Sequence, residues 1–247
     1  MERRHTCVGL YFSLLPEFQN SSCVARFVRS RAFLSNLTAG GIAVPEFGTP
    51  VRRSKSAFRG FSRSQVMSDN TMITVYPFDS ALYTYYESPF MHKIDPQNLA
   101  TLGKEDMGRK GLVSQAAHPH WDREGNMFTL GLRLSLTGPR YTITKFKKGE
   151  GDRRRSLPQR GVKVGDIPCS NSFFPSYMHS FAITDHWIVV IEQPLVVSRG
   201  ETCQIFTQPI EQVSVTAMAT ALVTSKPVSS ALRWKAANPV FFHLLHR

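Results

Sequence analysis

The sequence lacks paired cysteines and long apolar runs. Its four cysteines, Cys7, Cys23, Cys169 and Cys203, lie far apart and form no C-x-x-C pair, which excludes a zinc ribbon and a disulfide scaffold. Apolar runs such as Trp187–Ile191 are far shorter than the roughly 18 residues that a membrane-spanning helix needs. The cysteine usage and an N-terminus without a small-residue cleavage site favour a cytoplasmic location.

Acidic residues are few: 18 Asp and Glu stand against 30 Lys and Arg, which gives a net charge of +12. This excess permits a nucleic-acid partner, contact with an anionic membrane surface, or a merely basic protein. The basic clusters at 52–55 and 147–155 lie in segments rich in Ser, Gly and Asp, which are typical of solvated loops. No zinc-finger spacing, basic heptad region or ribonucleoprotein motif is present, so we expect no nucleic-acid partner.

Short strand-like segments dominate the chain. With 247 residues, of which 42% are hydrophobic, the chain is long enough to bury a core. From about residue 70, segments rich in Tyr, Thr, Val and Ile alternate with turn residues, which predicts antiparallel strands at 71–77, 81–87, 126–134, 141–146 and 187–191. The predicted fold class is all-β, and the pattern leaves a propeller, a barrel and a sandwich open.

Two histidine settings could hold a metal ion. His118 and His120 flank a proline, and His179 lies in a second segment that also follows a turn. In an extended segment residues i and i+2 point to the same side, so His118 and His120 can share a face. His120-Trp-Asp122 also has the H-x-D form of iron oxygenases with two histidines and one carboxylate. Alternatively, Asp122 begins an Asp-Arg-Glu-Gly turn, and the histidines are turn and core residues without a metal.

Longer strings resemble a known family. They are Ser114-Gln-Ala-Ala-His118-Pro-His-Trp-Asp-Arg-Glu-Gly125, Phe173-Phe-Pro-Ser-Tyr-Met-His179-Ser-Phe-Ala-Ile-Thr184 and Val190-Ile-Glu-Gln-Pro194-Leu195. Shorter strings precede them at 26–30, 46–49, 69–70, 75–77, 86–88 and 93–96. In this order and spacing, over about residues 26–197, the chain resembles the carotenoid cleavage oxygenases, in particular the animal β-carotene oxygenases and retinoid isomerases.

The resemblance implies a seven-bladed β-propeller whose axis carries non-haem ferrous iron, Fe(2+), held by four histidines. His118 matches the first of these ligands and His179 the second, whereas His120 matches none. Glu87 matches a glutamate whose carboxylate would accept the other ring N–H of a ligating histidine and fix its tautomer. The implied reaction is oxidative cleavage of a carotenoid double bond by O2, giving products such as retinal. An apolar carotenoid or retinoid substrate also implies peripheral contact with a membrane.

The chain departs from the family pattern at both ends. Residues 1–25 have no match, 26–197 match the propeller blades, and 198–247 form a poorly matched tail that ends before the third ligand. Its string Phe242-His243-Leu-Leu-His246-Arg247 lacks the Asn, Tyr and Glu of the third-ligand motif, so we expect His243 to be a strand residue.

These departures predict a truncated chain with roughly the first half of a propeller. The chain alone is expected to be inactive, because two ligands do not hold ferrous iron as four do. The alternative is a non-enzymatic fragment that binds carotenoid or a partner through an exposed apolar edge.

Overall fold

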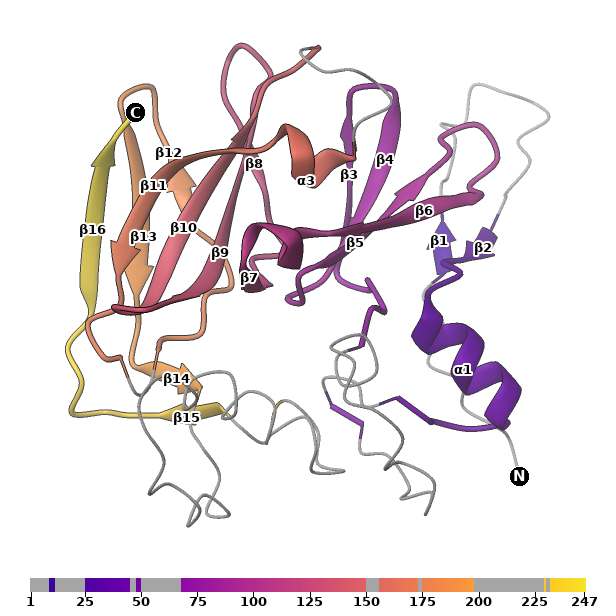
Figure 1. The fold of residues 1–247 in the computed structure, drawn as a ribbon, viewed down its shortest axis with the longest axis horizontal. Coiled ribbons are helices and arrows are strands. Elements are labelled where there is room, and N and C mark those ends of the chain that lie inside the picture. Colours follow the sequence, from indigo (N-terminus) through magenta and orange to yellow (C-terminus); the bar gives the residue numbers. More distant parts are fainter. Residues whose placement is uncertain are drawn as a thin grey trace.

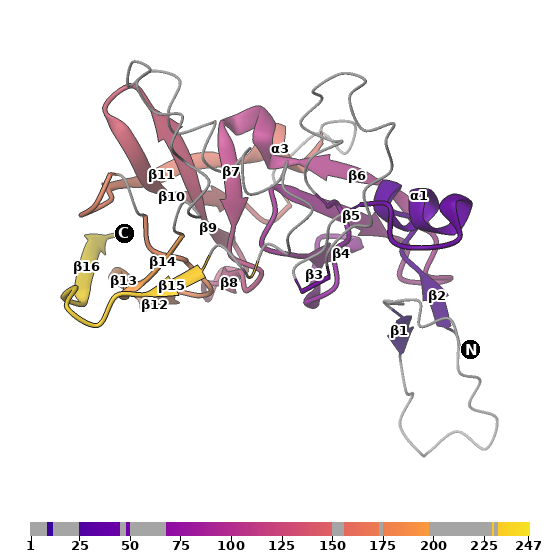
Figure 2. The same ribbon diagram turned by 90° about the horizontal axis from the view of Figure 1, so that it is seen from below.

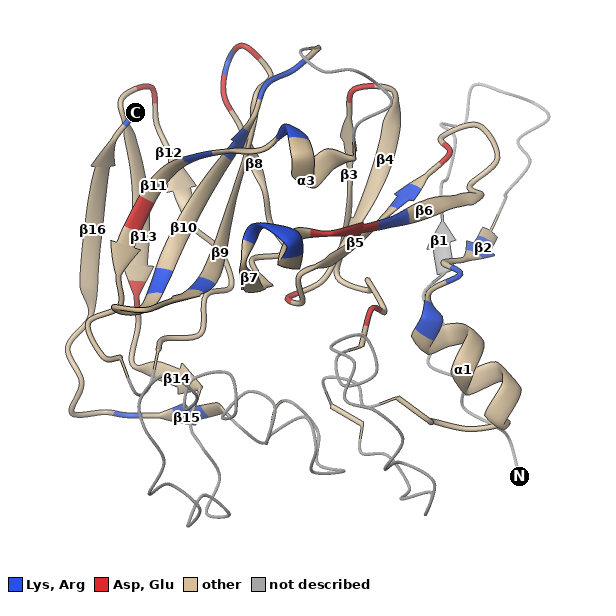
Figure 3. Cartoon of the chain, viewed as in Figure 1, with Lys and Arg blue, Asp and Glu red and all other residues tan. Residues whose placement is uncertain are grey.

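The computed structural model describes residues 9–11, 25–44, 48–49, 68–149, 156–172, 175–197, 229 and 232–247. The basic cluster at 52–55, the arginines at 153–155 and most of the segment 198–230 lie outside the described residues. In the described part, Lys and Arg are spread over several elements and do not gather on one of them (Figure 3).

The first sheet has four antiparallel strands in sequence order: β3 (Thr74–Phe78), β4 (Ala81–Tyr85), β5 (Phe90–Ile94) and β6 (Thr101–Asp106). β3 and β4 pair as an antiparallel hairpin, close to the predicted strands 71–77 and 81–87. Its turn places Asp79 at a φ of 53°, a left-handed conformation that Asp tolerates better than most residues.

The second sheet has the order β11-β10-β9-β7, and β8 also pairs with β9. Its strands are β7 (Leu112–Gln115), β8 (His120–Trp121), β9 (Met127–Ser135), β10 (Gly138–Phe146) and β11 (Val162–Pro168). β9 and β10 pair along their whole length, and they include the predicted strands 126–134 and 141–146 almost completely.

Strands from distant parts of the chain form the third sheet, which has the order β12-β13-β16. Its strands are β12 (Ala182–Ile183), β13 (Trp187–Glu192) and β16 (Phe241–His246). Two smaller sheets pair β14 (Leu195–Val197) with β15 (Leu232–Trp234), and β1 (Gly9–Tyr11) with β2 (Ala25–Phe27).

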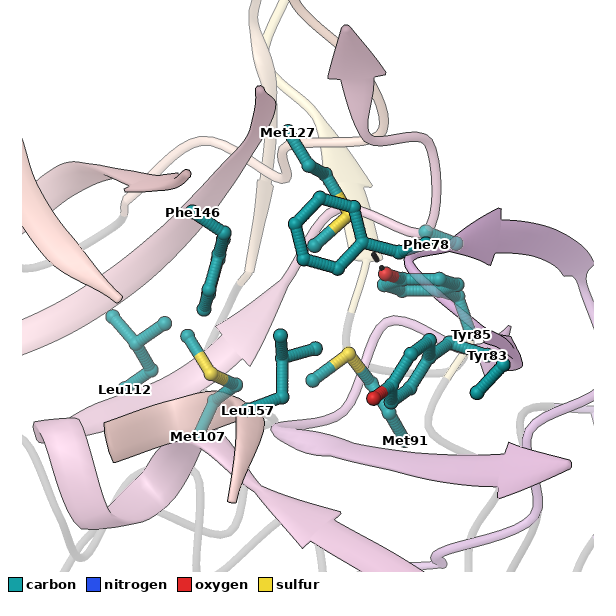
Figure 4. Close-up of a cluster of buried hydrophobic side chains, with 11 residues drawn as sticks. Phe78, Tyr83, Tyr85, Met91, Met107, Leu112, Met127, Phe146 and Leu157 are labelled. Carbon is teal, nitrogen blue, oxygen red and sulfur yellow. Dashed lines mark hydrogen bonds between the residues drawn. The ribbon is translucent and has the colours of Figure 1, made fainter. Parts of the chain in front are cut away.

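Apolar side chains join the sheets into one body. One cluster lies between the first and second sheets, where Tyr85, Met91, Met127 and Phe146 are fully buried (Figure 4). A second cluster connects the second and third sheets through residues such as Ile143 and Val190.

The helices of the described residues are short. They are α1 (Arg31–Ala39), the 3-10 helix η1 (Met107–Lys110) and α3 (Leu157–Arg160). Figures 1 and 2 show α1 at the β6 end of the molecule and β16 at the opposite end. Within the described ranges, no helix has the length and apolarity needed to cross a membrane.

The protein is therefore mostly β, as the sequence predicts. The described sheets lie side by side and do not close into a ring (Figure 1). The expected number of seven blades stays a prediction.

Candidate metal centre

Two histidines from separate loops meet at one point. His118 lies between β7 and β8, and His179 lies just before β12. Their Nε2 atoms are 3.2 Å apart, and their ring centroids are separated by 4.7 Å. The fold thus brings together the two residues that the sequence analysis selected as metal ligands, although 61 positions separate them along the chain.

Glu87 completes this cluster from the first sheet. It follows β4 and precedes β5, and its side chain is only 9% exposed. Its Oε1 lies 2.5 Å from Nδ1 of His179, and its Oε2 accepts the hydroxyl of Tyr177. A carboxylate at Nδ1 retains the ring proton there, so the Nε2 lone pair of His179 faces His118.

The electrostatics favour a neutral imidazole at His118. Burial lowers the pKa of His118, and the neighbouring His179 lowers it further, although Glu87 acts in the opposite direction. Burial also raises the pKa of Tyr177, as does its hydrogen bond to Glu87. Tyr177 therefore stays protonated and acts as a donor, while His118 offers a nitrogen lone pair.

His120 lies beside the pair without joining it. Its ring packs edge-on against Phe181, with centroids 4.7 Å apart. The same two segments form the contact between His118 and His179, which lie two residues before His120 and Phe181. This arrangement agrees with His118 and His120 sharing a face of an extended segment. Among the described residues, His120 Nε2 has no hydrogen-bond partner.

Asp122 is the first residue of the Asp-Arg-Glu-Gly turn, and not a ligand of the H-x-D type. Its Oδ1 accepts the backbone N–H groups of Glu124 and Asn126, at 3.1 and 2.8 Å. Its Oδ2 accepts Asn126 Nδ2 at 2.9 Å and Arg247 Nη2 at 2.6 Å. Because both oxygens are occupied, Asp122 offers no free carboxylate for a site with two histidines and one carboxylate.

His243 lies on β16, as expected for a strand residue. It is opposite Val190 of β13, and its Nε2 contacts Oε2 of Glu192 at 3.0 Å. This ring nitrogen is thus engaged by a carboxylate on a neighbouring strand.

The geometry of the pair fits two ligands of one metal ion. Two nitrogens that bind an ion at about 2.1 Å each lie about 3.0 to 3.4 Å apart for bond angles between about 90° and 109°. The observed 3.2 Å falls within this range, and neutral imidazole is a common ligand for iron. Within the part of the chain that the structure describes, no group of three or more His, Cys, Asp or Glu side chains could hold a metal.

Tyr177 is the contact that the sequence analysis missed. The string that identifies His179 also contains this tyrosine two residues earlier, to which the sequence analysis assigns no role. The signal was available, because residues i and i+2 of an extended segment share a side. A tyrosine at that position therefore reaches the same glutamate as the histidine.

The fold and the histidine pair define a mostly β protein with a candidate metal centre where segments of three sheets meet. The chain belongs to the carotenoid oxygenase family: the family model described as "Retinal pigment epithelial membrane protein" matches residues 9–247.

Curated relatives carry related names. The carotenoid isomerooxygenase of Drosophila melanogaster is 34% identical over 228 residues, and the match covers 90% of this chain and 33% of the relative. The Beta,beta-carotene 15,15'-dioxygenase of Gallus gallus is 30% identical over 234 residues, with 90% of this chain and 41% of the relative covered. The chain thus spans between about a third and two fifths of the length of these relatives.

Solved structures with the same fold include a variant of the Synechocystis apocarotenoid oxygenase. It matches with a TM-score of 0.60 at 15% identity, over 90% of this chain and 41% of that chain. The lignostilbene dioxygenase of Pseudomonas brassicacearum matches with a TM-score of 0.54 at 18% identity, over 91% of this chain and 39% of that chain. At these identities the likeness concerns the fold alone.

Proposed function

We propose that this chain is part of a non-haem ferrous dioxygenase that cleaves a carbon–carbon double bond of a carotenoid, with O2 as co-substrate. His118 and His179 supply two of the iron ligands, and Glu87 orients His179. The 3.2 Å separation of the two Nε2 atoms carries the proposal, and the names of the relatives give the substrate class. Bound ferrous iron would supply the activation of dioxygen.

The residues of this chain have positioning roles in that reaction. Glu87 retains the Nδ1 proton of His179, so the Nε2 lone pair faces His118. Tyr177 donates to the other oxygen of Glu87 and restricts the rotation of the carboxylate. Because the two nitrogens already lie 3.2 Å apart, they need little reorganisation when a metal binds, which lowers the free energy needed to assemble the site.

We also propose that the chain alone does not turn over carotenoid. The two histidines are half of the four-histidine set that the family resemblance implies, and metal affinity falls steeply as ligands are lost. A cytoplasmic location with peripheral membrane contact belongs to the same proposal, since the substrate is apolar and the chain carries a net charge of +12.

Iron binding tests the ligand assignment. The purified chain is titrated anaerobically with ferrous ion, and the broadening of histidine ring NMR signals by the paramagnetic ion is followed. The signals of His118 and His179 should broaden first, and His118→Ala or His179→Ala should abolish the effect at the remaining partner. His186→Ala, at an exposed histidine in another loop, is the matched control and should behave like the wild type.

Equal broadening in the wild type and in both alanine variants would overturn the ligand assignment. Carotenoid turnover by the iron-loaded chain would overturn the proposed inactivity and leave the ligand assignment intact.

A second candidate function is non-enzymatic binding through an apolar edge. On β16, Phe242 is 66% exposed and Leu244 is 62% exposed, and Trp234 on β15 is 63% exposed. Phe242 and Leu244 are two positions apart on β16 and so lie on the same face of the strand, and exposed apolar side chains that share a face are typical of interaction sites. A spectral shift of added carotenoid without product, which is lost in Phe242→Ser, would favour this function.

A further inference from the structure

One buried carboxylate takes no part in the contacts of the histidine pair. Glu192, at the end of β13, is 3% exposed. Its Oε1 accepts the hydroxyl of Tyr141 at 3.0 Å and the backbone N–H of Ser170 at 3.1 Å. Its Oε2 contacts His243 Nε2 at 3.0 Å. Three groups on three separate segments thus converge on one carboxylate.

Tyr141 links Glu192 to the segment that carries His179. Tyr141, on β10, is fully buried, and burial raises the pKa of its hydroxyl, so the group stays protonated and donates to Glu192. The same oxygen accepts the backbone N–H of Ser176 at 2.8 Å. The hydroxyl is therefore fixed as donor on one side and as acceptor on the other.

The backbone of the segment explains why Ser176 needs this partner. Tyr177 donates its N–H to the carbonyl of Leu195 at 2.8 Å, and Val197 donates its N–H to the carbonyl of Pro175 at 3.0 Å. The segment thus runs along one edge of β14, with Ser176 opposite Val196. Successive N–H groups of an extended chain point to opposite sides, so the N–H of Ser176 faces away from β14 and finds Tyr141.

Tyr177 and His179 follow directly and both contact Glu87. We propose that Tyr141, held by Glu192, is a positioning residue that sets Tyr177 and His179 against Glu87. His243 fixes the second oxygen of Glu192 and so forms the outer end of the same chain of hydrogen bonds. The functional meaning of this inference rests on the proposed metal centre, whereas the geometry that it predicts concerns the metal-free chain.

The test observes the contact between His179 and Glu87 directly. In the ¹⁵N-histidine-labelled, metal-free chain, the Nδ1 proton of His179 should resonate downfield and exchange slowly, because a carboxylate oxygen lies 2.5 Å away. Tyr141→Phe removes one hydroxyl and keeps the ring. We expect the exchange rates of this proton and of the Ser176 amide to rise by about tenfold or more.

Tyr83→Phe is the matched control, because Tyr83 is a buried tyrosine in the first sheet, 4% exposed. The control should leave the His179 proton unchanged, whatever its effect on the melting temperature. An unchanged His179 proton in Tyr141→Phe, or an equal change in both variants, would overturn the proposal.

His243→Ala decides the question if Tyr141→Phe does not fold. His243 lies on the outermost strand of its sheet, with its side chain 24% exposed, so its loss leaves the core intact. We expect about a threefold faster exchange of the His179 proton, and wild-type exchange would contradict the proposal. If the His179 proton responds as expected but ferrous ion does not broaden the wild-type signals, the positioning role holds and the proposed metal function fails.

Discussion

Glu87 shows how one side chain can fix the chemistry of another. Its two oxygens take up different donors, the imidazole of His179 and the hydroxyl of Tyr177. The carboxylate therefore has little freedom to rotate, and its negative charge faces the ring nitrogen that must stay protonated. Because the side chain is mostly shielded from water, this interaction is stronger than an exposed pair would be.

The first prediction concerns this carboxylate. Glu87→Gln keeps the shape of the side chain but removes its charge, so it weakens the preference for a proton on Nδ1 of His179. Substitutions of this kind lower metal affinity by about 10- to 100-fold, and we expect a loss of this size in the ferrous titration. Glu105→Gln is the control, because Glu105 is also half-buried but accepts the backbone N–H of Leu157; a similar loss in both variants would contradict the role of Glu87.

The second prediction concerns His92, which is 2% exposed and contacts Thr71 Oγ1 through Nδ1 at 3.1 Å. Burial lowers the pKa of His92 to about 4, an effect that Lys104 strengthens and Asp69 opposes. Because the unfolded state takes up the proton first, His92 stabilises the fold fully above its ordinary pKa of about 6.5. This stabilisation is lost as the pH falls from about 6.5 to about 4, by up to about 3 kcal/mol.

Urea unfolding of the wild type and of His92→Gln, measured across this pH range, checks the prediction. The free energy of unfolding of the wild type should fall more steeply than that of the variant below about pH 6.5. Above that pH the difference between the two should be constant. Parallel curves over the whole range would show that His92 does not titrate as its burial requires.

At the scale of single elements, α1 depends on the residues just before it. Ser30 is the N-cap and accepts the N–H of Phe33 at 2.9 Å, and its hydroxyl donates to Asn70 at 2.8 Å. The buried carboxylate of Asp69 accepts the N–H groups of Arg31 and Ala32. The free N–H groups of the first turn are thus satisfied by side chains from two segments.

The third prediction is that Ser30→Ala lowers the free energy of unfolding by about 1 to 2 kcal/mol, because it removes the cap and leaves Asn70 without this donor. Ser35→Ala in the middle of the same helix is the control and should change stability by less than about 0.5 kcal/mol. Denaturant midpoints of the two variants measure the difference. An equal loss of unfolding free energy in both variants would show that the stability of α1 depends on its composition and not on its N-cap.

Elements with a local signal were predictable, whereas pairings between distant segments were not. β9 was predicted because Phe128, Leu130 and Leu132 alternate with residues of the other face. The helix α1 was missed, although Ser30 and Gly40 stand at its ends, because nine residues carry a weak periodicity. The pairing of β13 with β16 spans about fifty residues, and no local pattern sets its register.

The candidate site follows the same rule. Histidine in an extended segment is compatible with a metal ligand or with a core residue, so the residues alone left both interpretations open. The family resemblance selected His118, His179 and Glu87, and the fold brings these three together. Glu192 and Tyr141 were not predicted as parts of this region, because their link to the segment of His179 runs through a backbone N–H that no sequence motif indicates.

At the scale of the whole molecule, Arg247 connects the second and third sheets. Its Nη2 donates to Asp122 at 2.6 Å, its Nη1 donates to the carbonyl of Thr184 at 3.0 Å, and its guanidinium lies 4.9 Å from the centroid of the Phe128 ring. Burial raises the pKa of Asp122, yet the hydrogen bonds from Asn126 and the charge of Arg247 hold it below its usual range. One side chain thus links β16 to the turn before β9 and to the loop before β13.

The fourth prediction compares two arginines that each contact an aspartate. Arg247 has a side chain that is 18% exposed and a partner that is 2% exposed, whereas Arg123 is 87% exposed and its partner Asp185 is 50% exposed. Arg247→Gln should lower the free energy of unfolding by about 1.5 to 3 kcal/mol, since a shielded carboxylate loses a charged donor. Arg123→Gln should change it by less than about 1 kcal/mol, because water and salt screen the exposed pair.

Denaturant unfolding at low and high salt separates the two cases. The effect of Arg247→Gln should persist at 1 M salt, where the screening length is about 3 Å, because most of its contacts are shielded from solvent. If Arg247→Gln were no more destabilising than Arg123→Gln, β16 would be held by its pairing with β13 and by the packing of Leu245 against the apolar cluster. The two sheets would then be joined by their shared apolar cluster, and the guanidinium would add nothing to the cohesion of the molecule.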